Sequence, residues 1–262
     1  MNTNITKIPI GLKSAVDAIQ ETIEQAHIYH RCGLNPPHYI INLDAGNGQT
    51  TLTEYIAESY AGHGVRHFGE LDMFLEYILD GSMEQLKKIF ADIRACAVYT
   101  NEFEGVISLD IAKLASHVNE AQLDVFIKEI SKISTYATLV FYIPATMNRN
   151  IASLVGKIHE ALDDVVMVNV EPYSVEELVE IVKGMIADAG VIVEESFELD
   201  KYLLNYIEAE HINNVKTAKK LSQMMVKNAN FDGFLPRLSY SDIENATLLA
   251  GKEKKEVKIY EK

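Results

Sequence analysis

Residues 43–51 read Leu-Asp-Ala-Gly-Asn-Gly-Gln-Thr-Thr, and this stretch decides how the rest of the chain is interpreted. The phosphate-binding pattern G-x-x-x-x-G-K-[ST] fits it at Gly48 and Thr50. Leu43 stands in place of the first glycine, and Gln49 stands in place of the lysine. The backbone can therefore still curl around a phosphate, but the charge that the lysine supplies is missing.

The residues around this loop follow the order of strand, glycine loop and helix that a phosphate-binding loop requires. A β-prone run at 38–43 comes after Asn35-Pro36-Pro37, which separates it from the preceding segment. Residues 50–61 then carry apolar side chains at helical spacing. In this setting the backbone N–H groups of the loop and the N-terminus of the helix favour an anion. The alternative is an ordinary Gly-Asn-Gly turn in front of a helix, and the loop alone leaves both open.

The composition narrows the class of protein. The chain has 262 residues and a hydrophobic content of 48%, so it can bury a full core. Its formal net charge of −14 opposes nonspecific binding to nucleic acid. It contains no apolar run long enough to span a bilayer, no signal-peptide pattern, and only two cysteines, Cys32 and Cys96. We therefore expect a cytoplasmic protein that binds neither membranes nor nucleic acid.

Strands and helices alternate along the first two thirds of the chain. Besides the run at 38–43, strands are predicted at 63–68, 105–110, 138–143 and 165–168. Helices are predicted at 12–31, 50–61, 70–79, 83–97, 119–134 and 149–161. This alternation is typical of an α/β protein whose parallel sheet is covered on both faces. The sequence therefore predicts a parallel five-stranded sheet between helices.

The pattern changes after Pro172. Ser174 and Glu177 form a capping-box pattern that opens a helix. Further helices are predicted at 196–210 and 214–229. We therefore expect two domains, an α/β domain over residues 1–171 and a small all-α domain with a C-terminal tail over residues 172–262.

Taken together, these segments resemble the AAA+ ATPases. The resemblance is closest to the branch of the red-type Rubisco activases and the stage V sporulation ATPase. It spans about residues 8–230 and rests on the order and spacing of motifs, none of which is intact. The segments that carry it are residues 10–16, 33–38, 46–51, 106–110, 139–148, 171–178 and 213–216. The resemblance implies a P-loop NTPase-type nucleotide-binding domain followed by a helical lid.

The resemblance also implies which residues would hold ATP or ADP with Mg. In the family, backbone near the glycine of the first segment contacts the adenine, and the loop and sensor motifs surround the phosphates. Carried over position by position, the nucleotide-binding residues are Ile10, Gly11, Ala45, Gly46, Asn47, Gly48, Gln49, Thr50, Thr51, Asn148 and Lys216. The magnesium ligands are Thr50 and Asp110, if nucleotide binds at all.

Several catalytic groups of the family are missing. An active member needs the loop lysine, a glutamate after the metal-binding aspartate to activate water, and an arginine that neutralises developing charge. Here Gln49 replaces the lysine, and Ile111 follows Asp110, which remains as the remnant of the acidic motif. The stretch 157–164 contains no arginine, and Lys216 replaces the second-sensor arginine without its planar fork. We therefore expect a degenerate AAA+ domain, a pseudo-ATPase with weak or no hydrolysis and weak or lost nucleotide binding.

Three functions remain open at this point. The first is a scaffolding or regulatory module that acts on a protein partner or client, in a homo- or hetero-oligomer. The second is a nucleotide sensor whose lid closes on ATP or ADP. The third is an active AAA+ ATPase that remodels a protein client in a homo-oligomeric ring, which the missing arginine opposes. The sequence does not separate the scaffold from the sensor.

Overall fold

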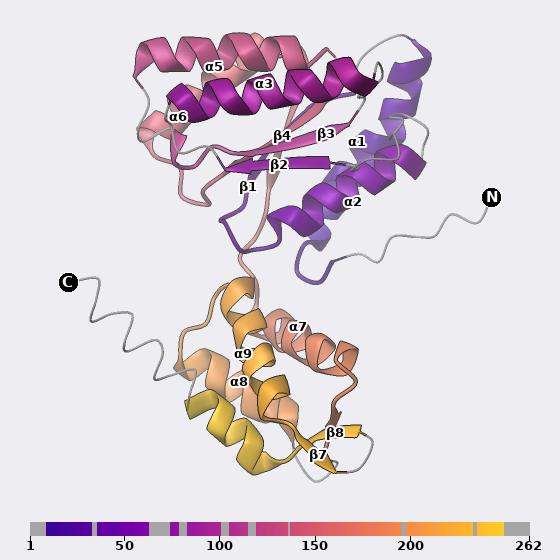
Figure 1. The fold of residues 1–262 in the computed structure, drawn as a ribbon, viewed down its shortest axis with the longest axis vertical. Helices are drawn as coiled ribbons and strands as arrows, with labels where there is room; N and C mark the ends of the chain where they lie inside the picture. Colours follow the sequence, from indigo (N-terminus) through magenta and orange to yellow (C-terminus); the bar gives the residue numbers. More distant parts are fainter. Residues whose placement is uncertain are drawn as a thin grey trace. The chain divides into compact units, whose positions relative to one another are not determined.

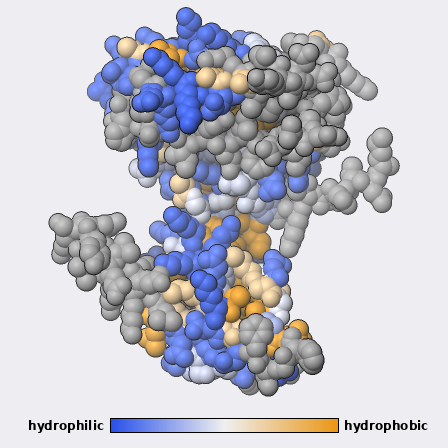
Figure 2. All heavy atoms as spheres, viewed as in Figure 1, coloured by the Kyte–Doolittle hydropathy of each residue, from blue (hydrophilic) through white to orange (hydrophobic). Residues whose placement is uncertain are grey.

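The chain divides into two compact units, Met1–Glu171 and Pro172–Lys262 (Figure 1). The computed structural model describes residues 9–32, 36–62, 74–78, 83–100, 105–114, 119–135, 137–194, 198–232 and 235–248. The described surface of the first unit seen in Figure 2 is mainly hydrophilic, with small apolar patches. Within the described ranges, no helix combines the length and the apolar character needed to cross a bilayer.

The first unit is built on a five-stranded sheet. Its strands are β1 (His38–Asn42), β2 (Phe74–Ile78), β3 (Val106–Asp110), β4 (Thr138–Ile143) and β5 (Val165–Asn169). They run parallel in the order β2-β3-β4-β1-β5. The central strands are buried along their length, as the continuous apolar runs indicate. The predicted parallel five-stranded sheet is confirmed.

Helices cover both faces of this sheet (Figure 1). They are α1 (Lys13–Arg31), α2 (Gln49–Gly62), α3 (Met83–Thr100), α5 (Glu120–Ile133) and α6 (Arg149–Ala161). Side chains alternate across each strand, so Ile40 and Phe141 pack in one core with α3, α5 and α6. Tyr142 points to the opposite face, where it contacts α2. The predicted α/β layering is therefore confirmed, and β1 and α2 flank the glycine loop.

The second strand lies elsewhere than predicted. A helix was expected over 70–79, but residues 74–78 form strand β2, so that expectation is wrong. The run Phe-Leu-Glu-Tyr-Ile pairs residue by residue with β3, from Phe74 beside Val106 to Ile78 beside Asp110. Pairing with a buried neighbour outweighs a weak helical pattern in a short apolar run. The strand expected over 63–68 lies outside the described residues.

The second unit packs its helices around a core of its own. They are α7 (Val175–Asp188), α8 (Leu199–Ala209), α9 (Val215–Asn228) and a helix over residues 240–248. Their buried faces form a separate apolar cluster that includes Val182, Leu203 and Leu221. The helices predicted after Ser174 are thus present, and the helical character of this unit is confirmed.

The second unit also contains strands, so the prediction of an all-α domain is incomplete. Strands β6 (Ile192–Val193), β7 (Asn230–Asp232) and β8 (Leu235–Leu238) form a small sheet in the order β6-β8-β7. Strands β7 and β8 pair antiparallel, and β6 pairs parallel with β8. Strands of two to four residues give too little periodicity to be found in a sequence.

The capping box that opens α7 gives a direct test of the second unit. The hydroxyl of Ser174 accepts from the N–H of Glu177 at 3.1 Å, and the N–H of Ser174 donates to the Glu177 carboxylate at 2.8 Å. We expect Ser174→Ala to weaken the first turn of α7 by about 1 kcal/mol, because the N–H of Glu177 loses the hydroxyl that accepts from it. Hydrogen exchange should then be roughly five-fold faster in that turn. Ser153→Ala, at an exposed position inside α6, is the control and should leave exchange unchanged; equal effects would contradict the cap.

Candidate functional site

The glycine loop, residues 43–48, lies at the carboxyl edge of the five-stranded sheet. Strand β1 has β4 on one side and β5 on the other. From β1 the chain continues to the far edge strand β2, whereas from β4 it crosses over β1 to reach β5. These connections leave in opposite directions, and the crevice at such a point is where open α/β sheets bind ligands.

The backbone of the glycine loop has the curvature that a phosphate requires. Gly46 and Gly48 have φ angles of 87° and 98°, a region in which a side chain would be strained. The N–H of Asn47 donates to the carbonyl of Asp44 at 3.1 Å, which tightens the turn. The N–H of Leu52 donates to the carbonyl of Gly48 at 2.9 Å and so begins α2. The shape of the loop and of the helix N-terminus therefore suits a bound anion.

Gln49 turns back onto the loop. Its Nε2 donates to the carbonyl oxygen of Leu43 at 2.7 Å, and the side chain is half-buried. Leu43 and Gln49 stand at the two ends of the loop, so this single hydrogen bond closes it. A lysine at the same position would carry a full charge to the phosphates. The amide supplies none and uses one of its two donors on the protein itself.

A buried hydrogen-bond network supports the first turn of α2 from below. The hydroxyl of Tyr142 on β4 donates to the carbonyl of Gln49 at 2.8 Å. It also lies 2.8 Å from the hydroxyl of Thr53, which itself lies 3.0 Å from the same carbonyl. Both side chains are fully buried, so their hydroxyls need these partners. The network therefore fixes the start of α2 against the central strand.

A second pair of hydroxyls joins β1 to the same helix. Tyr39 and Tyr60 lie 2.7 Å apart at their hydroxyl oxygens and are completely buried. Burial, with the neighbouring Tyr60 hydroxyl as a further cause, raises the pKa of Tyr39 well above its usual value. Tyr39 therefore stays neutral, and the pair serves as a structural contact.

The end of β4 also holds the loop and the end of β3. The N–H of Leu43 donates to the carbonyl of Ile143 at 2.9 Å. The carboxylate of Asp44 accepts from the N–H of Ala145 at 3.2 Å. On the other side, the N–H of Ile111 donates to the carbonyl of Tyr142 at 3.0 Å. The end of β3 and the glycine loop are therefore both bonded to the same strand.

The residue that follows Asp110 in the chain is not a general base. Asp110 ends β3 as a mainly buried side chain, and its Oδ1 accepts from the N–H of Ala112 at 3.0 Å. Ile111 is completely buried within the apolar core. Where an active ATPase holds a glutamate beside its attacking water, this chain therefore packs an alkyl side chain.

Other predicted site residues have identifiable structural roles. Ile10 and Gly11 form a turn before α1, with a φ of 75° at Gly11. Asn148 caps α6, accepting from the N–H of Ile151 at 3.0 Å. Lys216 is exposed in the first turn of α9, in the second unit.

The loop threonines and the metal remain candidates on chemistry alone. Thr50 is exposed and Thr51 is half-buried in the first turn of α2, and Ala45 is exposed in the loop. Among the described residues, no group of three or more His, Cys, Asp or Glu side chains is placed to hold a metal ion. A magnesium ion at Thr50 and Asp110 would depend on phosphate oxygens for further ligands.

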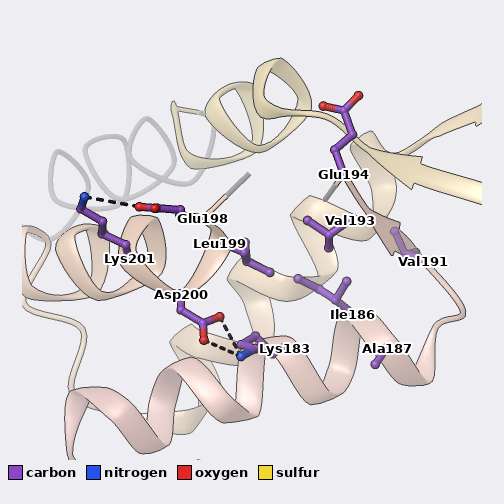
Figure 3. A pocket seen from close by; sticks show the side chains of 10 residues that line it. All are labelled: Lys183, Ile186, Ala187, Val191, Val193, Glu194, Glu198, Leu199, Asp200 and Lys201. Atoms are coloured by element: carbon purple, nitrogen blue, oxygen red, sulfur yellow. Dashed lines mark hydrogen bonds and ion pairs between the residues drawn. The ribbon is translucent and has the colours of Figure 1, made fainter. Parts of the chain in front are cut away.

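A separate hollow of about 660 Å³ lies in the second unit (Figure 3). Ile186, Val193 and Leu199 converge on it from α7, β6 and α8. Its cations are already engaged, with Lys183 at 2.7 Å from Asp200 and Lys201 at 3.3 Å from Glu198. None of the predicted nucleotide-binding residues lines it. We therefore place the candidate site at the glycine loop.

Sequence reasoning missed three residues whose side chains hold the loop and the start of α2 in place. Asp44, Thr53 and Tyr142 were not among the predicted site residues. Thr53 lies one helical turn after Gln49, and Tyr142 is next to the core residue Phe141 on its strand. The sequence pattern therefore indicates which face of its helix or strand each residue occupies. Their meeting joins positions 89 residues apart, and no local pattern gives that distance.

Solved structures of RuvB from Thermotoga maritima are similar to this chain. One, described as a Holliday junction branch migration motor, is 16% identical, covers 92% of this chain and 70% of its own, and has a TM-score of 0.55. A single-residue variant of that protein is 15% identical over the same shares, with a TM-score of 0.57. No protein-family model and no curated protein matches the sequence. At this identity the likeness shows the fold alone, a P-loop NTPase-type parallel sheet between helices followed by a helical unit.

Replacing the central hydroxyl tests whether β4 supports the loop. We expect Tyr142→Phe to lower the free energy of unfolding by about 1–2 kcal/mol, because a buried donor is lost while Thr53 still serves the Gln49 carbonyl. Hydrogen exchange should also rise in the first turn of α2. Denaturant titration and exchange mass spectrometry measure the two effects. Tyr55→Phe, a buried tyrosine elsewhere on α2, is the control; an equal loss in both variants would show that the network has no special role.

Proposed function

We propose that this chain is a degenerate AAA+ module that binds nucleotide weakly or not at all, hydrolyses it slowly or not at all, and acts as a scaffolding or regulatory subunit. The observation that carries the proposal is Gln49, whose amide bonds to Leu43 where a lysine would reach the phosphates. A loop of the right shape without its charge supports anion binding of low affinity. The specific likeness to the Rubisco activase and sporulation ATPase branch belongs to this proposal as well.

The missing lysine is expected to weaken nucleotide binding by an amount that follows from the lost contact. Removing a charge-assisted contact to phosphate costs roughly 2–4 kcal/mol. A micromolar dissociation constant would thereby become tens of micromolar to about millimolar. The backbone amides of the loop, Thr50 and the helix N-terminus would still contact phosphate, and the turn at Ile10 and Gly11 would contact adenine. Nucleotide is therefore an occasional ligand in this proposal, with ATP or ADP and Mg as its form.

The loss of turnover is expected to be larger. Ile111 gives no base for water, and residues 157–164 offer no arginine to a neighbouring subunit. Each such group is worth two or more orders of magnitude in rate in active enzymes. Several losses on separate catalytic roles argue for a function that does not depend on hydrolysis.

A protein is the partner that the charge favours. The net charge of −14 opposes a role on DNA, so the branch-migration activity of RuvB is not carried over to this chain. The low cysteine content agrees with a cytoplasmic setting. Assembly with copies of itself or with other AAA+ subunits would give such a module a position from which to recruit a client.

Restoring the lysine tests the proposal. We expect Gln49→Lys to tighten binding of ATP with Mg by roughly 30- to 900-fold, the equivalent of about 2–4 kcal/mol, because the loop already has the required shape. Turnover should stay near background, because Ile111 still replaces the base. Isothermal titration and a phosphate-release assay measure the two quantities.

The control carries the same charge elsewhere. Gln20→Lys adds a lysine at an exposed position of α1 and should leave both quantities unchanged. Micromolar binding and steady turnover by the unmodified protein, both abolished by Asp110→Ala, would contradict the proposal and favour an active ATPase. Stabilisation of the unmodified protein that grows with ATP in a thermal-shift titration would favour the sensor over the scaffold.

A further inference from the structure

A short linker joins the two units, and contacts of described residues hold it at both ends. It consists of residues 170–173, which are neither helix nor strand, between the end of β5 at Asn169 and Ser174, the cap of α7. The boundary between the two units falls inside this linker, after Glu171. The contacts on either side of the boundary therefore decide where the chain can turn.

The first end of the linker is bonded to the strand that precedes the glycine loop. Asn42 is the last residue of β1 and pairs with Asn169, the last residue of β5. The Oδ1 atom of Asn42 accepts from the N–H of Val170 at 2.5 Å, one residue beyond that pair. Val170 is itself buried. The side chain of Asn42 therefore extends the attachment of this part of the chain past the end of the sheet.

The other end of the linker is held by the second unit. Tyr173 packs against the apolar cluster of that unit. Burial raises the pKa of Tyr173 to about 12, with the neighbouring carboxylate of Glu177 as a further cause. The capping box of Ser174 follows directly in the chain. Tyr173 therefore belongs to the packing of the second unit.

Only Glu171 and Pro172 lie between these two attachments, and both are exposed. The proline ring fixes its own φ near −65° and favours an extended conformation for the residue before it. Hinges are commonly formed by a few residues at the ends of elements, which absorb a change in backbone torsions. A pivot of two residues with restricted torsions allows only a narrow range of directions, as long as Val170 stays in place.

We propose that Asn42 is a positioning residue that anchors the linker at Val170, so that the chain between the two units turns at Glu171 and Pro172. Loss of the acceptor on Asn42 would release Val170 and lengthen the pivot to three residues. Asn42 directly precedes Leu43, the first residue of the glycine loop, so the linker is anchored next to the candidate site. This inference rests on the contacts of the linker and is independent of nucleotide binding at the glycine loop.

The test removes the acceptor in one variant and keeps it in another. Asn42→Leu has a side chain of similar size that cannot accept a hydrogen bond, whereas Asn42→Asp keeps a carboxylate oxygen that can. Asn119→Leu is the control for a general loss of stability, because it removes the side-chain cap of α5 in the same unit. All variants are compared as the full chain.

Two measurements are made on each variant. Hydrogen exchange followed by NMR reports the protection of the Val170 amide. Electron–electron double resonance reports the distribution of distances between spin labels introduced by Ser153→Cys on α6 and Glu208→Cys on α8, which are exposed positions in the two units. For the second measurement Cys32 and Cys96 are replaced by serine, so that labels attach only at the introduced cysteines.

We expect the Val170 amide to exchange about five-fold faster in Asn42→Leu than in the unmodified protein, because it has lost its acceptor. The distance distribution should be at least roughly 1.5-fold broader in that variant, because the pivot is longer. Asn42→Asp and Asn119→Leu should match the unmodified protein in both measurements. An unchanged distribution in Asn42→Leu, or an equally broad one in Asn42→Asp or Asn119→Leu, overturns the proposal. Asn42→Ala repeats the comparison if Asn42→Leu does not fold.

Discussion

The hydrogen bond from the Gln49 amide to the Leu43 carbonyl sets the character of the site. It joins the two ends of the glycine loop, so the loop holds its curved form through its own chain. A lysine in this position would carry a positive charge that attracts a phosphate and repels other cations. The amide of a glutamine is uncharged and can pair with a backbone carbonyl instead. The loop therefore keeps the backbone geometry of an anion-binding site but can hold that geometry without a bound anion.

Strand β4 is the element on which this geometry depends. Its last residues accept from Leu43 and Ile111, and Tyr142 reaches the first turn of α2 from the buried side. The glycine loop, the end of β3 and α2 thus share one support. These hydrogen bonds join the loop to the central strand of the α/β unit.

The sequence predicts the sheet more accurately than it predicts the contacts of the candidate site. Long apolar runs such as β4 and a capping box such as Ser174 with Glu177 are local signals, and the structure contains both. β2 was mistaken for a helix because its five residues show no decisive period, and pairing with β3 decided the outcome. The sequence itself shows the uncharged residues Gln49 and Ile111. It does not show the contact with Leu43 or the burial of Ile111, because both depend on how distant strands pack together.

A crystal structure grown with an ATP analogue and Mg, at a ligand concentration near 100 μM, tests the central claim most directly. The account predicts at most a partly occupied triphosphate over Gly48, with the Gln49 amide still bonded to the Leu43 carbonyl. A fully occupied triphosphate, with Mg bound by Thr50 and positioned by Asp110 and the Gln49 side chain turned away from Leu43, would contradict it.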